Sequence, residues 1–316
     1  MSLAIEARGL YKNFPGRGPA LDGLDLRVAA GTVHGVLGPN GAGKTTTVRI
    51  LSTLQRLDSG QARVAGHDVV TDPAAVRARI GVAGQYAAVD EILTGRQNLE
   101  MFARLNHLRP RQARTRSRQL LERFDLQGAA DRPAGHYSGG MRRRLDLAVS
   151  LIRSPQVLFL DEPTTGLDPR SRTQVWDAVR ELASTGTTVL LTTQYLEEAD
   201  RLCSRITLLA SGKVAAEGTP RELKERIGTS RIEVTVPPGF DTYTIAGYLS
   251  AALEAPPEID LDLGRICIPI RGQASELAQV AQAMATTGLP MSALSLRQPD
   301  LDEVFLQLTA PEGVTP

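Results

Sequence analysis

Residues 38–46, GPNGAGKTT, combine three glycines with a lysine and two neighbouring hydroxyl side chains. Glycines let backbone N–H groups wrap closely around phosphate oxygens, and a lysine beside them adds a charge that can reach the outer phosphates. A buried-type strand, Val33–Leu37, precedes the segment, and a helical pattern with Val48, Ile50 and Leu51 follows it. The segment therefore lies at a helix N-terminus, where the helix dipole favours an anion, and it predicts a phosphate-binding loop.

The polar positions of this loop have distinct predicted tasks. We expect Lys44 to reach the β- and γ-phosphates, Thr45 to place its hydroxyl on Mg²⁺, and Thr46 to assist at the phosphate end. The main chain should surround the phosphates at Gly38, Asn40, Gly41 and Gly43. ATP and Mg²⁺ are therefore the predicted cofactors.

A carboxylate pair, Asp161 and Glu162, follows a second buried strand at residues 157–160. In a phosphate-loop site, the first carboxylate after a neighbouring strand holds Mg²⁺ through water, and a carboxylate beside it can polarise the attacking water. Asp161 is therefore the predicted metal residue and Glu162 the predicted catalytic residue. A helix cap or a solvated turn is the alternative explanation of such a pair.

A third motif, Ser138-Gly139-Gly140, opens the helix that runs to Ile152. Ser138 is a natural N-cap, and the two glycines leave N–H groups open to an anion at the positive end of the helix. Alone, this motif would indicate only a capped loop. Its meaning comes from the phosphate loop before it and the carboxylate pair after it.

The three motifs in this order resemble the ATP-binding cassette family of transport ATPases, and the resemblance covers residues 3–225. It implies an α/β fold with a P-loop NTPase core of mixed or parallel sheet, an antiparallel β subdomain, and a helical subdomain at about residues 86–153. It also implies a homodimer, because in this family residues 138–140 would contact the γ-phosphate that the opposite subunit binds. One chain would then supply only half of each ATP site.

The resemblance assigns tasks to further residues. Tyr11 matches the aromatic residue that stacks on adenine, and Asp168 matches the acidic residue of the D-loop. Gln85 matches the Q-loop glutamine, which touches Mg²⁺ and lies near the membrane partner. A buried tyrosine with a packing role is the alternative for Tyr11.

Position 194 departs from the family pattern. The family usually has a histidine after the strand at residues 187–193, where it contacts the γ-phosphate, and this chain has Gln194. Glutamine can hydrogen-bond a phosphate oxygen or a water but cannot shuttle a proton at neutral pH. Because Glu162 remains, we expect hydrolysis to survive, with Gln194 as a further catalytic residue.

Three segments, residues 137–148, 192–200 and 301–306, resemble the daunorubicin-resistance ATP-binding subunits of actinobacterial drug exporters. This resemblance implies a peripheral ATPase at the cytoplasmic face of the cell membrane that energises efflux of a hydrophobic antibiotic through a separate transmembrane permease. A soluble, non-transport cassette ATPase and the cassette of a lipid or polysaccharide exporter are the alternatives. Repair members of the first class insert coiled coils or zinc modules before the Ser-Gly-Gly motif, and this chain has neither heptads nor a cysteine cluster there.

Composition sets the outer limits of function. A chain of 316 residues with 42% hydrophobic and 22% charged residues is long enough for two domains and too apolar for disorder. A net charge of +1 gives no general attraction to nucleic acid, so we expect none as a partner. No window approaches the ~18 apolar residues of a membrane span. The two cysteines exclude a disulfide framework and indicate a reducing cytoplasm.

Short apolar runs alternate with amphipathic helices up to residue 228, which is typical of α/β folds. Buried parallel-type strands are predicted at Val33–Leu37, Ile80–Ala83, 157–160 and 189–192, and a hairpin in a separate antiparallel patch at 206–210 and 214–217. The following residues have the order strand-helix-strand-strand-helix-strand, which indicates a small ferredoxin-like α+β domain. We therefore predict a nucleotide-binding domain at residues 1–228 and an accessory domain at residues 229–316.

Seven arginines lie between residues 104 and 123, at positions 104, 109, 111, 114, 116, 118 and 123. A solvated helix face is the common explanation of such a run. Contact with anionic lipid headgroups or with the cytoplasmic face of a membrane partner is the alternative.

Overall fold

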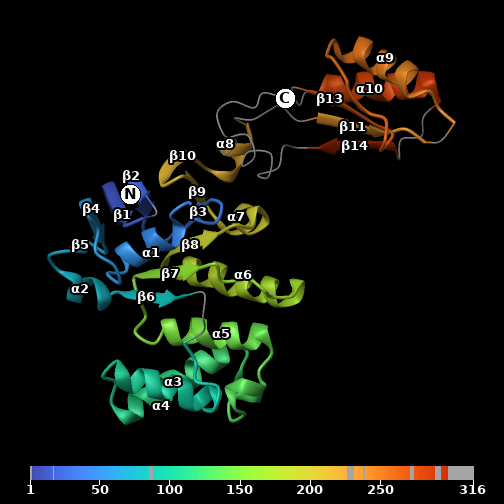
Figure 1. The fold of residues 1–316 in the computed structure, drawn as a ribbon. Coiled ribbons are helices and arrows are strands. Elements are labelled where there is room, and N and C mark those ends of the chain that lie inside the picture. The colour runs from blue at the N-terminus through green and yellow to red at the C-terminus, as the bar shows by residue number, and fades with distance from the viewer. Residues whose placement is uncertain are drawn as a thin grey trace. The chain divides into compact units, whose positions relative to one another are not determined.

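The computed structural model describes residues 2–16, 18–84, 88–225, 231–237, 239–270, 274–288 and 293–297. The chain divides into two compact units, Met1–Pro220 and Arg221–Pro316 (Figure 1). The predicted domain boundary at residues 228 and 229 lies outside the described residues, as do Gln85 and the segment 301–306.

A six-stranded sheet forms the centre of the first unit, with the strand order β10-β9-β3-β8-β7-β6. Its strands are β3 (Val33–Leu37), β6 (Ile80–Ala83), β7 (Val157–Asp161), β8 (Thr188–Thr193), β9 (Arg205–Ala210) and β10 (Lys213–Gly218). All neighbours pair in parallel except β9 and β10, which are antiparallel. The predicted parallel strands are confirmed, and β3, β7 and β8 are buried along their whole length.

The prediction that the β9–β10 hairpin forms a separate antiparallel patch is wrong. β9 pairs in parallel with β3 from His34 to Leu37, so the hairpin extends the central sheet. The physical reason is that residues 206–209 are buried on both faces of the strand, as a strand inside a layered sheet must be. A short apolar run looks the same in the sequence whether its neighbour is parallel or antiparallel.

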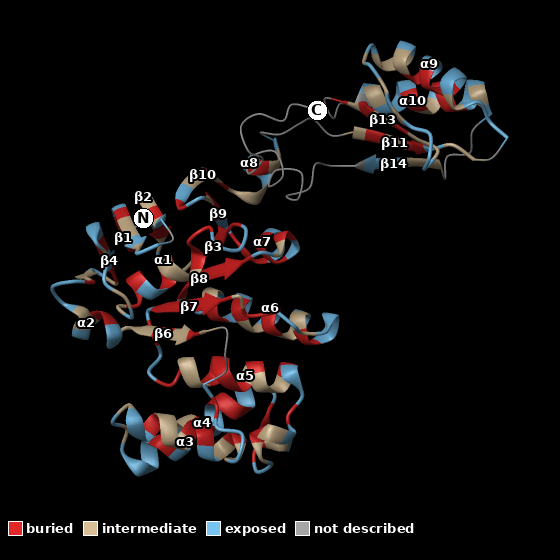
Figure 2. Cartoon of the chain, viewed as in Figure 1, coloured by how far each residue is buried: buried red, intermediate tan, exposed pale blue. Residues whose placement is uncertain are grey.

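A second, antiparallel sheet has the strand order β2-β1-β4-β5. Its strands are β1 (Leu3–Phe14), β2 (Gly18–Ala29), β4 (Ser59–Val64) and β5 (His67–Asp68). One apolar core joins this sheet to the central sheet and to helix α1 (Lys44–Leu51), as the buried segments in Figure 2 show; its members include Ile5, Leu26, Val36, Ile50 and Phe159. Apolar burial of this kind, at about 25 cal/mol per Å², holds the strand and the helix on either side of the phosphate loop in place.

Helices form the part of the first unit between β6 and β7 in the sequence. They are α3 (Gly95–Leu105), α4 (Pro110–Arg123) and α5 (Gly139–Ser150), with 3-10 turns at Gln127–Ala129 and Ala134–His136. α5 packs beside α6 (Pro169–Ser184), and α3 and α4 lie on the side of α5 away from the central sheet (Figure 1). The remaining helices of the first unit are α2 (Pro73–Arg77) and α7 (Leu196–Leu202), and α8 (Pro220–Glu225) follows β10. None of the helices that the structure describes has the length and apolarity required to traverse a bilayer.

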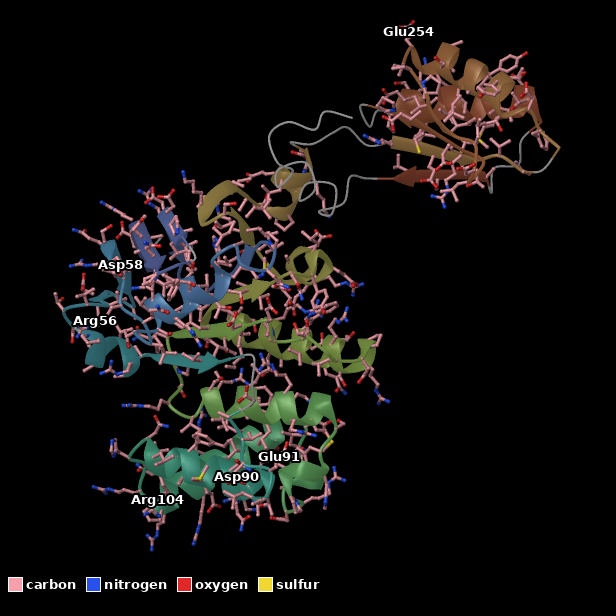
Figure 3. All side chains as sticks on the ribbon, viewed as in Figure 1. Arg56, Asp58, Asp90, Glu91, Arg104 and Glu254 are labelled. Carbon is pink, nitrogen blue, oxygen red and sulfur yellow. The ribbon has the colours of Figure 1, made fainter. Side chains whose placement is uncertain are left out.

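The arginine-rich stretch contains both packing and surface residues. Arg116 donates to the backbone oxygen of Leu151 at 2.6 Å, where α5 ends, and Arg123 forms an ion pair of 3.0 Å with Glu181 of α6. Arg104 is exposed at the edge of the helical part (Figure 3), as are the arginines at positions 109, 111, 114 and 118. Arg116 and Arg123 therefore hold helices together, while the rest of the stretch belongs to the surface.

The second unit contains an antiparallel sheet with the strand order β12-β13-β11-β14. Its elements are β11 (Arg231–Thr235), α9 (Thr242–Leu253), β12 (Glu258–Asp260), β13 (Arg265–Pro269), α10 (Ala274–Thr287) and β14 (Leu294–Arg297). Alternate residues of the strands pack against the helices in one core, which includes Ile232, Val234, Ile266, Ile268, Leu249 and Val280. The element order is the predicted one, and the ferredoxin-like assignment of the unit stays a prediction.

Two polar side chains are buried next to strand β3. His34 of β3 is 1% exposed, and its Nε2 lies 2.8 Å from Oγ1 of Thr207 on β9. Cys203, which directly follows α7, packs against Gly35, where an added Cβ would lie 2.7 Å from the sulfur. Burial raises the pKa of the Cys203 thiol and lowers the pKa of His34 to about 4. Both groups are therefore neutral at pH 7.

The neutral state of His34 predicts an acid-sensitive fold. In the unfolded chain a histidine titrates near pH 6.5, whereas folded His34 binds a proton only near pH 4. Between these values the unfolded state binds more protons, so the free energy of unfolding falls as the pH drops through this window. The variant His34→Gln keeps a hydrogen-bonding side chain but cannot bind this proton. When its free energy of unfolding is measured with urea, the decrease between about pH 7 and 4.5 should therefore be about 2 kcal/mol smaller than in the wild type.

A second histidine provides the control for this measurement. His67 lies at the surface beside Asp72, with Nδ1 at 2.8 Å from the carboxylate, and its side chain is 29% exposed. In His67→Gln the free energy of unfolding should therefore fall at low pH by nearly as much as in the wild type. An equal loss in His34→Gln and in the wild type would show that His34 does not set this sensitivity.

Candidate nucleotide-binding site

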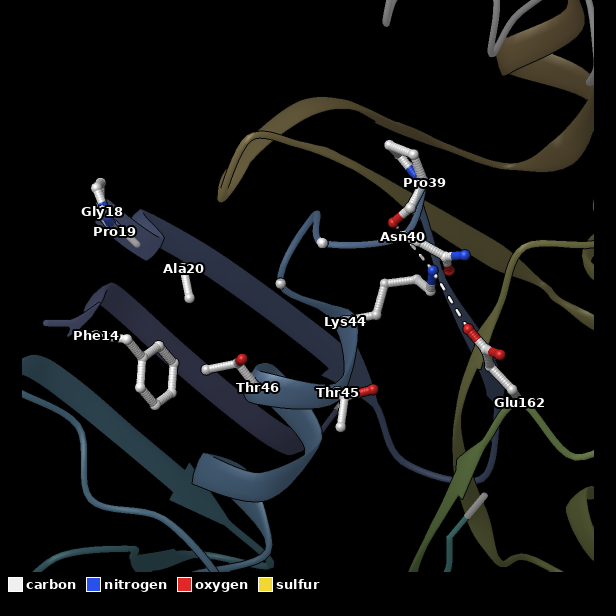
Figure 4. Close-up of a pocket in the computed structure, with 12 residues that line it drawn as sticks. Phe14, Gly18, Pro19, Ala20, Pro39, Asn40, Lys44, Thr45, Thr46 and Glu162 are labelled. Atoms are coloured by element: carbon white, nitrogen blue, oxygen red, sulfur yellow. Dashed lines mark hydrogen bonds and ion pairs between the residues drawn. The ribbon is translucent and has the colours of Figure 1, made fainter. Parts of the chain in front are cut away.

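A pocket of about 440 Å³ opens over the loop between β3 and α1 (Figure 4). Its lining comes from this loop, from the adjoining ends of β1 and β2, and from the residue that follows β7. The loop contributes Asn40, Gly41, Gly43, Lys44, Thr45 and Thr46, and β7 leads directly into Glu162. The structure therefore brings most of the predicted phosphate loop and the predicted catalytic carboxylate to one cavity.

Close neighbours explain the glycines of the loop. A Cβ on Gly38 would lie 2.5 Å from the backbone oxygen of Leu209, and a Cβ on Gly43 would lie 2.5 Å from that of Ala20. Gly43 also has a φ of 105°, which L side chains rarely adopt. Among the described residues no side chain caps α1, so the N–H groups of its first turn are available to an anion.

Lys44 is buried beneath the loop with its charged end at the pocket. Its side chain is 4% exposed, and Nζ donates to the backbone oxygens of Gly38 and Pro39 at 2.7 and 3.2 Å. Nζ also lies 3.4 Å from Oε1 of Glu162 (Figure 4). A buried ammonium costs free energy unless negative groups surround it, so the position suits a bound phosphate.

Oxygen groups meet beside Lys44 at the end of β7. Oγ1 of Thr45 donates to Oδ1 of Asp161 at 3.3 Å, and the hydroxyl of Thr192 on β8 hydrogen-bonds to the same carboxylate oxygen. Hydroxyl and carboxylate oxygens are ligands that Mg²⁺ prefers. Thr45 and Asp161 therefore fit the predicted metal site, and the third predicted metal residue, Gln85, lies outside the described residues.

Glu162 has a strained backbone. Its φ is 49°, a left-handed conformation that costs a non-glycine residue roughly 1–2 kcal/mol. Its N–H donates to the backbone oxygen of Thr192 at 3.0 Å and lies 3.2 Å from the hydroxyl of the same residue. Such a conformation persists only where the surrounding structure holds it, and it is common at functional sites.

Phe14, rather than Tyr11, lines the pocket. Phe14 ends β1, and Figure 4 shows its ring on the opposite side of the phosphate loop from Glu162. Tyr11 lies in the paired part of β1, opposite Asp22 and Ser59, and is not among the described residues that line the cavity. β1 has register shifts against β2 between Leu10 and Tyr11 and between Lys12 and Asn13. Phe14 was not predicted from the sequence, and its position next to the turn before β2 was the available signal.

Residues 138–140 lie at the start of α5, outside the described lining of this pocket. The hydroxyl of Ser138 accepts a hydrogen bond from the N–H of Met141 at 3.2 Å, so the predicted N-cap is confirmed. Gly140 packs so closely against Ser171 of α6 that a Cβ would overlap its side chain, and a Cβ on Gly139 would lie 3.6 Å from Leu167. Within one chain the motif is separate from the phosphate loop, and the predicted contact across a dimer stays a prediction.

The last two predicted residues follow β7 and β8. Asp168 caps α6, because its carboxylate accepts hydrogen bonds from the N–H and the hydroxyl of Ser171 at 2.9 and 2.7 Å. These hydrogen bonds lower the pKa of Asp168. Gln194 directly follows β8, is exposed, and is not among the described residues that line the pocket. The roles predicted for both residues stay predictions.

The glycine-rich loop connects strand β3 to helix α1, and its lysine lies close to the carboxylate that follows β7, two strands away in the sheet. This arrangement defines a P-loop nucleotide-binding domain. The antiparallel sheet and the helical insertion give it the architecture of an ATP-binding cassette. The model of the ABC transporter family matches residues 21–165. The chain is also 56% identical to the daunorubicin resistance ATP-binding protein DrrA2 of Streptomyces coeruleorubidus, over 97% of this chain and 95% of that protein.

The chain belongs to the ATP-binding cassette family of transport ATPases, in the group of daunorubicin-resistance ATP-binding proteins. The doxorubicin resistance ATP-binding protein DrrA of Mycobacterium tuberculosis is 47% identical, over 97% of this chain and 94% of that protein. A solved dimer of the ATP-binding cassette MJ0796 in a post-hydrolysis state, bound to ADP and Pi, shares the fold. It has a TM-score of 0.62 and 23% identity, and the match covers 68% of this chain and 98% of that chain. The family is one of ATPases, and the assignment of the pocket over Lys44 as its ATP site stays a prediction.

Proposed function

We propose that this chain is the ATP-hydrolysing subunit of an exporter that expels a hydrophobic antibiotic or a similar drug through a separate membrane permease. The names of its relatives, daunorubicin and doxorubicin resistance ATP-binding proteins, support this class of cargo. The observation that carries the energy-converting role is the pocket in which Lys44 meets Glu162 beside the phosphate loop. The role places the chain at the cytoplasmic face of the cell membrane, bound peripherally to its permease.

The residues of the pocket divide the work of hydrolysis. Lys44 and the N–H groups of the loop bind the β- and γ-phosphates of ATP and offset their charge. Thr45 and Asp161 would hold Mg²⁺, which when bound neutralises charge on the phosphate oxygens. Glu162 aligns the attacking water and accepts its proton while the oxygen bonds to the γ-phosphorus. The bond to the β-phosphate oxygen breaks in the same displacement and releases ADP and phosphate.

A homodimer would complete two such sites. Residues 138–140 of one copy would face the γ-phosphate held by the other, with Asp168 near the same interface. Gln194 would donate a hydrogen bond to the γ-phosphate in place of the usual histidine. ATP would then join the two copies, hydrolysis would release them, and the stretch around Gln85 would pass the motion to the permease. The net charge of +1 supports a set of partners without nucleic acid.

We assign the adenine contact to Phe14, because its ring lies across the loop from Glu162. Stacking of a base on an aromatic side chain contributes about 1–3 kcal/mol. Phe14→Ala should therefore raise the Kd for ATP about tenfold or more, while Tyr11→Ala should leave it within about twofold. Equilibrium binding of a fluorescent ATP analogue measures both variants. If Tyr11→Ala raised the Kd for ATP more than Phe14→Ala, the adenine contact would be assigned to Tyr11 instead.

Transport into inside-out membrane vesicles tests the export function. Vesicles that contain the chain and its permease should take up daunorubicin when ATP is added, and the Glu162→Gln variant should abolish this uptake. ATP hydrolysis that is stimulated by a lipid-linked substrate, without daunorubicin uptake, would favour the lipid or polysaccharide exporter. Failure of the chain to co-purify with any membrane protein would favour the soluble ATPase.

A further inference from the structure

The buried guanidinium of Arg143, on α5, connects two loops that carry different tasks in the proposed function. Arg143 is 7% exposed. Its Nε donates to the backbone oxygen of Pro163 at 2.8 Å, and its Nη1 donates to that of Gly84 at 2.6 Å. Pro163 directly follows Glu162, and Gly84 directly precedes Gln85. One planar side chain therefore spans the distance from the loop of the catalytic carboxylate to the start of the Q-loop.

Asp146, one turn further along α5, completes the arrangement. It is 3% exposed, and its Oδ2 accepts a hydrogen bond from Nη1 of Arg143 at 3.0 Å. Its Oδ1 accepts a hydrogen bond from the N–H of Ala88 at 2.9 Å. Gly84 and Ala88 are the described residues on either side of residues 85–87. A single buried ion pair thus binds both flanks of the stretch that contains the predicted Q-loop glutamine.

The contact with Pro163 acts on the strained part of the backbone. Glu162 has a φ of 49°, and its N–H is held by β8. On the other side of Glu162, a buried polar side chain hydrogen-bonds to each of the next two residues. Arg143 binds the carbonyl of Pro163, and Oε1 of Glu198 on α7 accepts a hydrogen bond from the hydroxyl of Thr164 at 2.9 Å. A left-handed glutamate keeps its conformation only while such restraints act on both sides.

We propose that Arg143 is a positioning residue for ATP hydrolysis. Through the carbonyls of Pro163 and Gly84 it keeps Glu162 in its strained conformation and ties that conformation to the flanks of residues 85–87. The inference rests on the proposed function, because it concerns hydrolysis of the ATP held over Lys44. An arginine suits this task because its planar fork directs several N–H donors at fixed angles, which a lysine ammonium cannot do.

Arg144, the next residue of α5, offers a matched control. Its side chain is 11% exposed, and its Nη1 donates to the backbone oxygen of Phe124 at 2.8 Å, just after the end of α4. Arg144 therefore also binds a main-chain carbonyl, but in the helical part of the unit rather than beside Glu162. Substitution of Arg143 or Arg144 removes the same charge from the same helix and releases a different loop.

The test compares Arg143→Gln, Arg143→Lys and Arg144→Gln in the purified full-length chain. Arg143→Gln should lower kcat for ATP hydrolysis at least about tenfold with the Kd for ATP within about twofold, because small misplacements of catalytic groups cost rates on this scale. Arg143→Lys should lose at least about threefold, since it keeps the charge without the fork. Arg144→Gln should keep the kcat of the wild type. Asp146→Asn should lower kcat in the same direction and add little in the Arg143→Gln background.

Several outcomes would overturn the positioning role. One is a kcat for both Arg143 variants equal to that of Arg144→Gln. Another is a fall in kcat that is matched by an equal rise in the Kd for ATP, because that pattern indicates general damage to the site. Thermal unfolding identifies variants that do not fold, and if Arg143→Gln is one of them, Arg143→Lys decides the matter. A wild-type chain without ATPase activity would overturn the proposed function and this inference with it.

Discussion

Replacement of Glu162 by glutamine is expected to abolish ATP turnover while the Kd for ATP stays within about threefold of the wild-type value. Glutamine has a similar size and can hydrogen-bond the attacking water, but it cannot accept a proton. Positioned general bases contribute typically about 10²–10⁴-fold to a rate, and kcat should fall by that factor. Main-chain contacts, among them the N–H donating to Thr192, hold the backbone at this residue, so the substitution should leave the conformation in place.

Phosphate release at steady state and equilibrium nucleotide binding measure the two quantities for Glu162→Gln. Glu181→Gln is the control, because Glu181 forms a surface ion pair with Arg123 and is not among the described residues that line the pocket. It should keep the kcat of the wild type. Full steady-state ATPase activity in Glu162→Gln would show that Glu162 is not the catalytic base.

Loss of the Lys44 ammonium should have an effect of similar size, on binding rather than on turnover. The side chain is 4% exposed, and two loop carbonyls hold Nζ at the pocket. Removal of one partner from a buried charge pair costs about 3–5 kcal/mol, so Lys44→Ala should raise the Kd for ATP by about a hundredfold or more. Alanine is the best helix former, so the first turn of α1 should persist.

Isothermal titration with ATP measures the effect of Lys44→Ala, and Lys213→Ala is its matched control. Lys213 is another of the few lysines in the chain; its side chain is 66% exposed, and it pairs with Asp22 at 3.1 Å. Lys213→Ala should therefore bind ATP as the wild type does. Wild-type affinity in a folded Lys44→Ala protein would contradict the assignment of this lysine to the phosphates.

Those parts of the fold and site that depend on near neighbours could be predicted from the sequence. Lys44 and Thr45 follow a strand within a few residues, so their place at the start of α1 was readable from spacing alone. The same holds for Glu162, which comes directly after β7, and for Ser138, whose side chain caps α5. In each case the chemistry and the element that positions it lie in one short segment.

Features that depend on contacts between distant segments could not be predicted. That Phe14, and not Tyr11, is among the described residues that line the pocket depends on how the end of β1 lies against the phosphate loop, which is a contact between segments far apart in the sequence. The hairpin of β9 and β10 belongs to the central sheet because β9 pairs with β3, which is likewise a contact between segments far apart in the sequence. Arg143 binds the oxygen of Gly84 across 59 residues of sequence, so its neighbours on α5 give no sign of that contact.

The packing of Cys203 against Gly35 makes the chain convenient for site-specific labelling. Maleimides react with the thiolate, and burial both shields the Cys203 sulfur and raises the pKa of its thiol. Of the two cysteines in the sequence, Cys267 is partly exposed and is the one that would compete for a probe. Replacement of Cys267 by serine therefore leaves a background in which a cysteine introduced at Ile92, which is 85% exposed, can carry a single fluorophore or cross-linker.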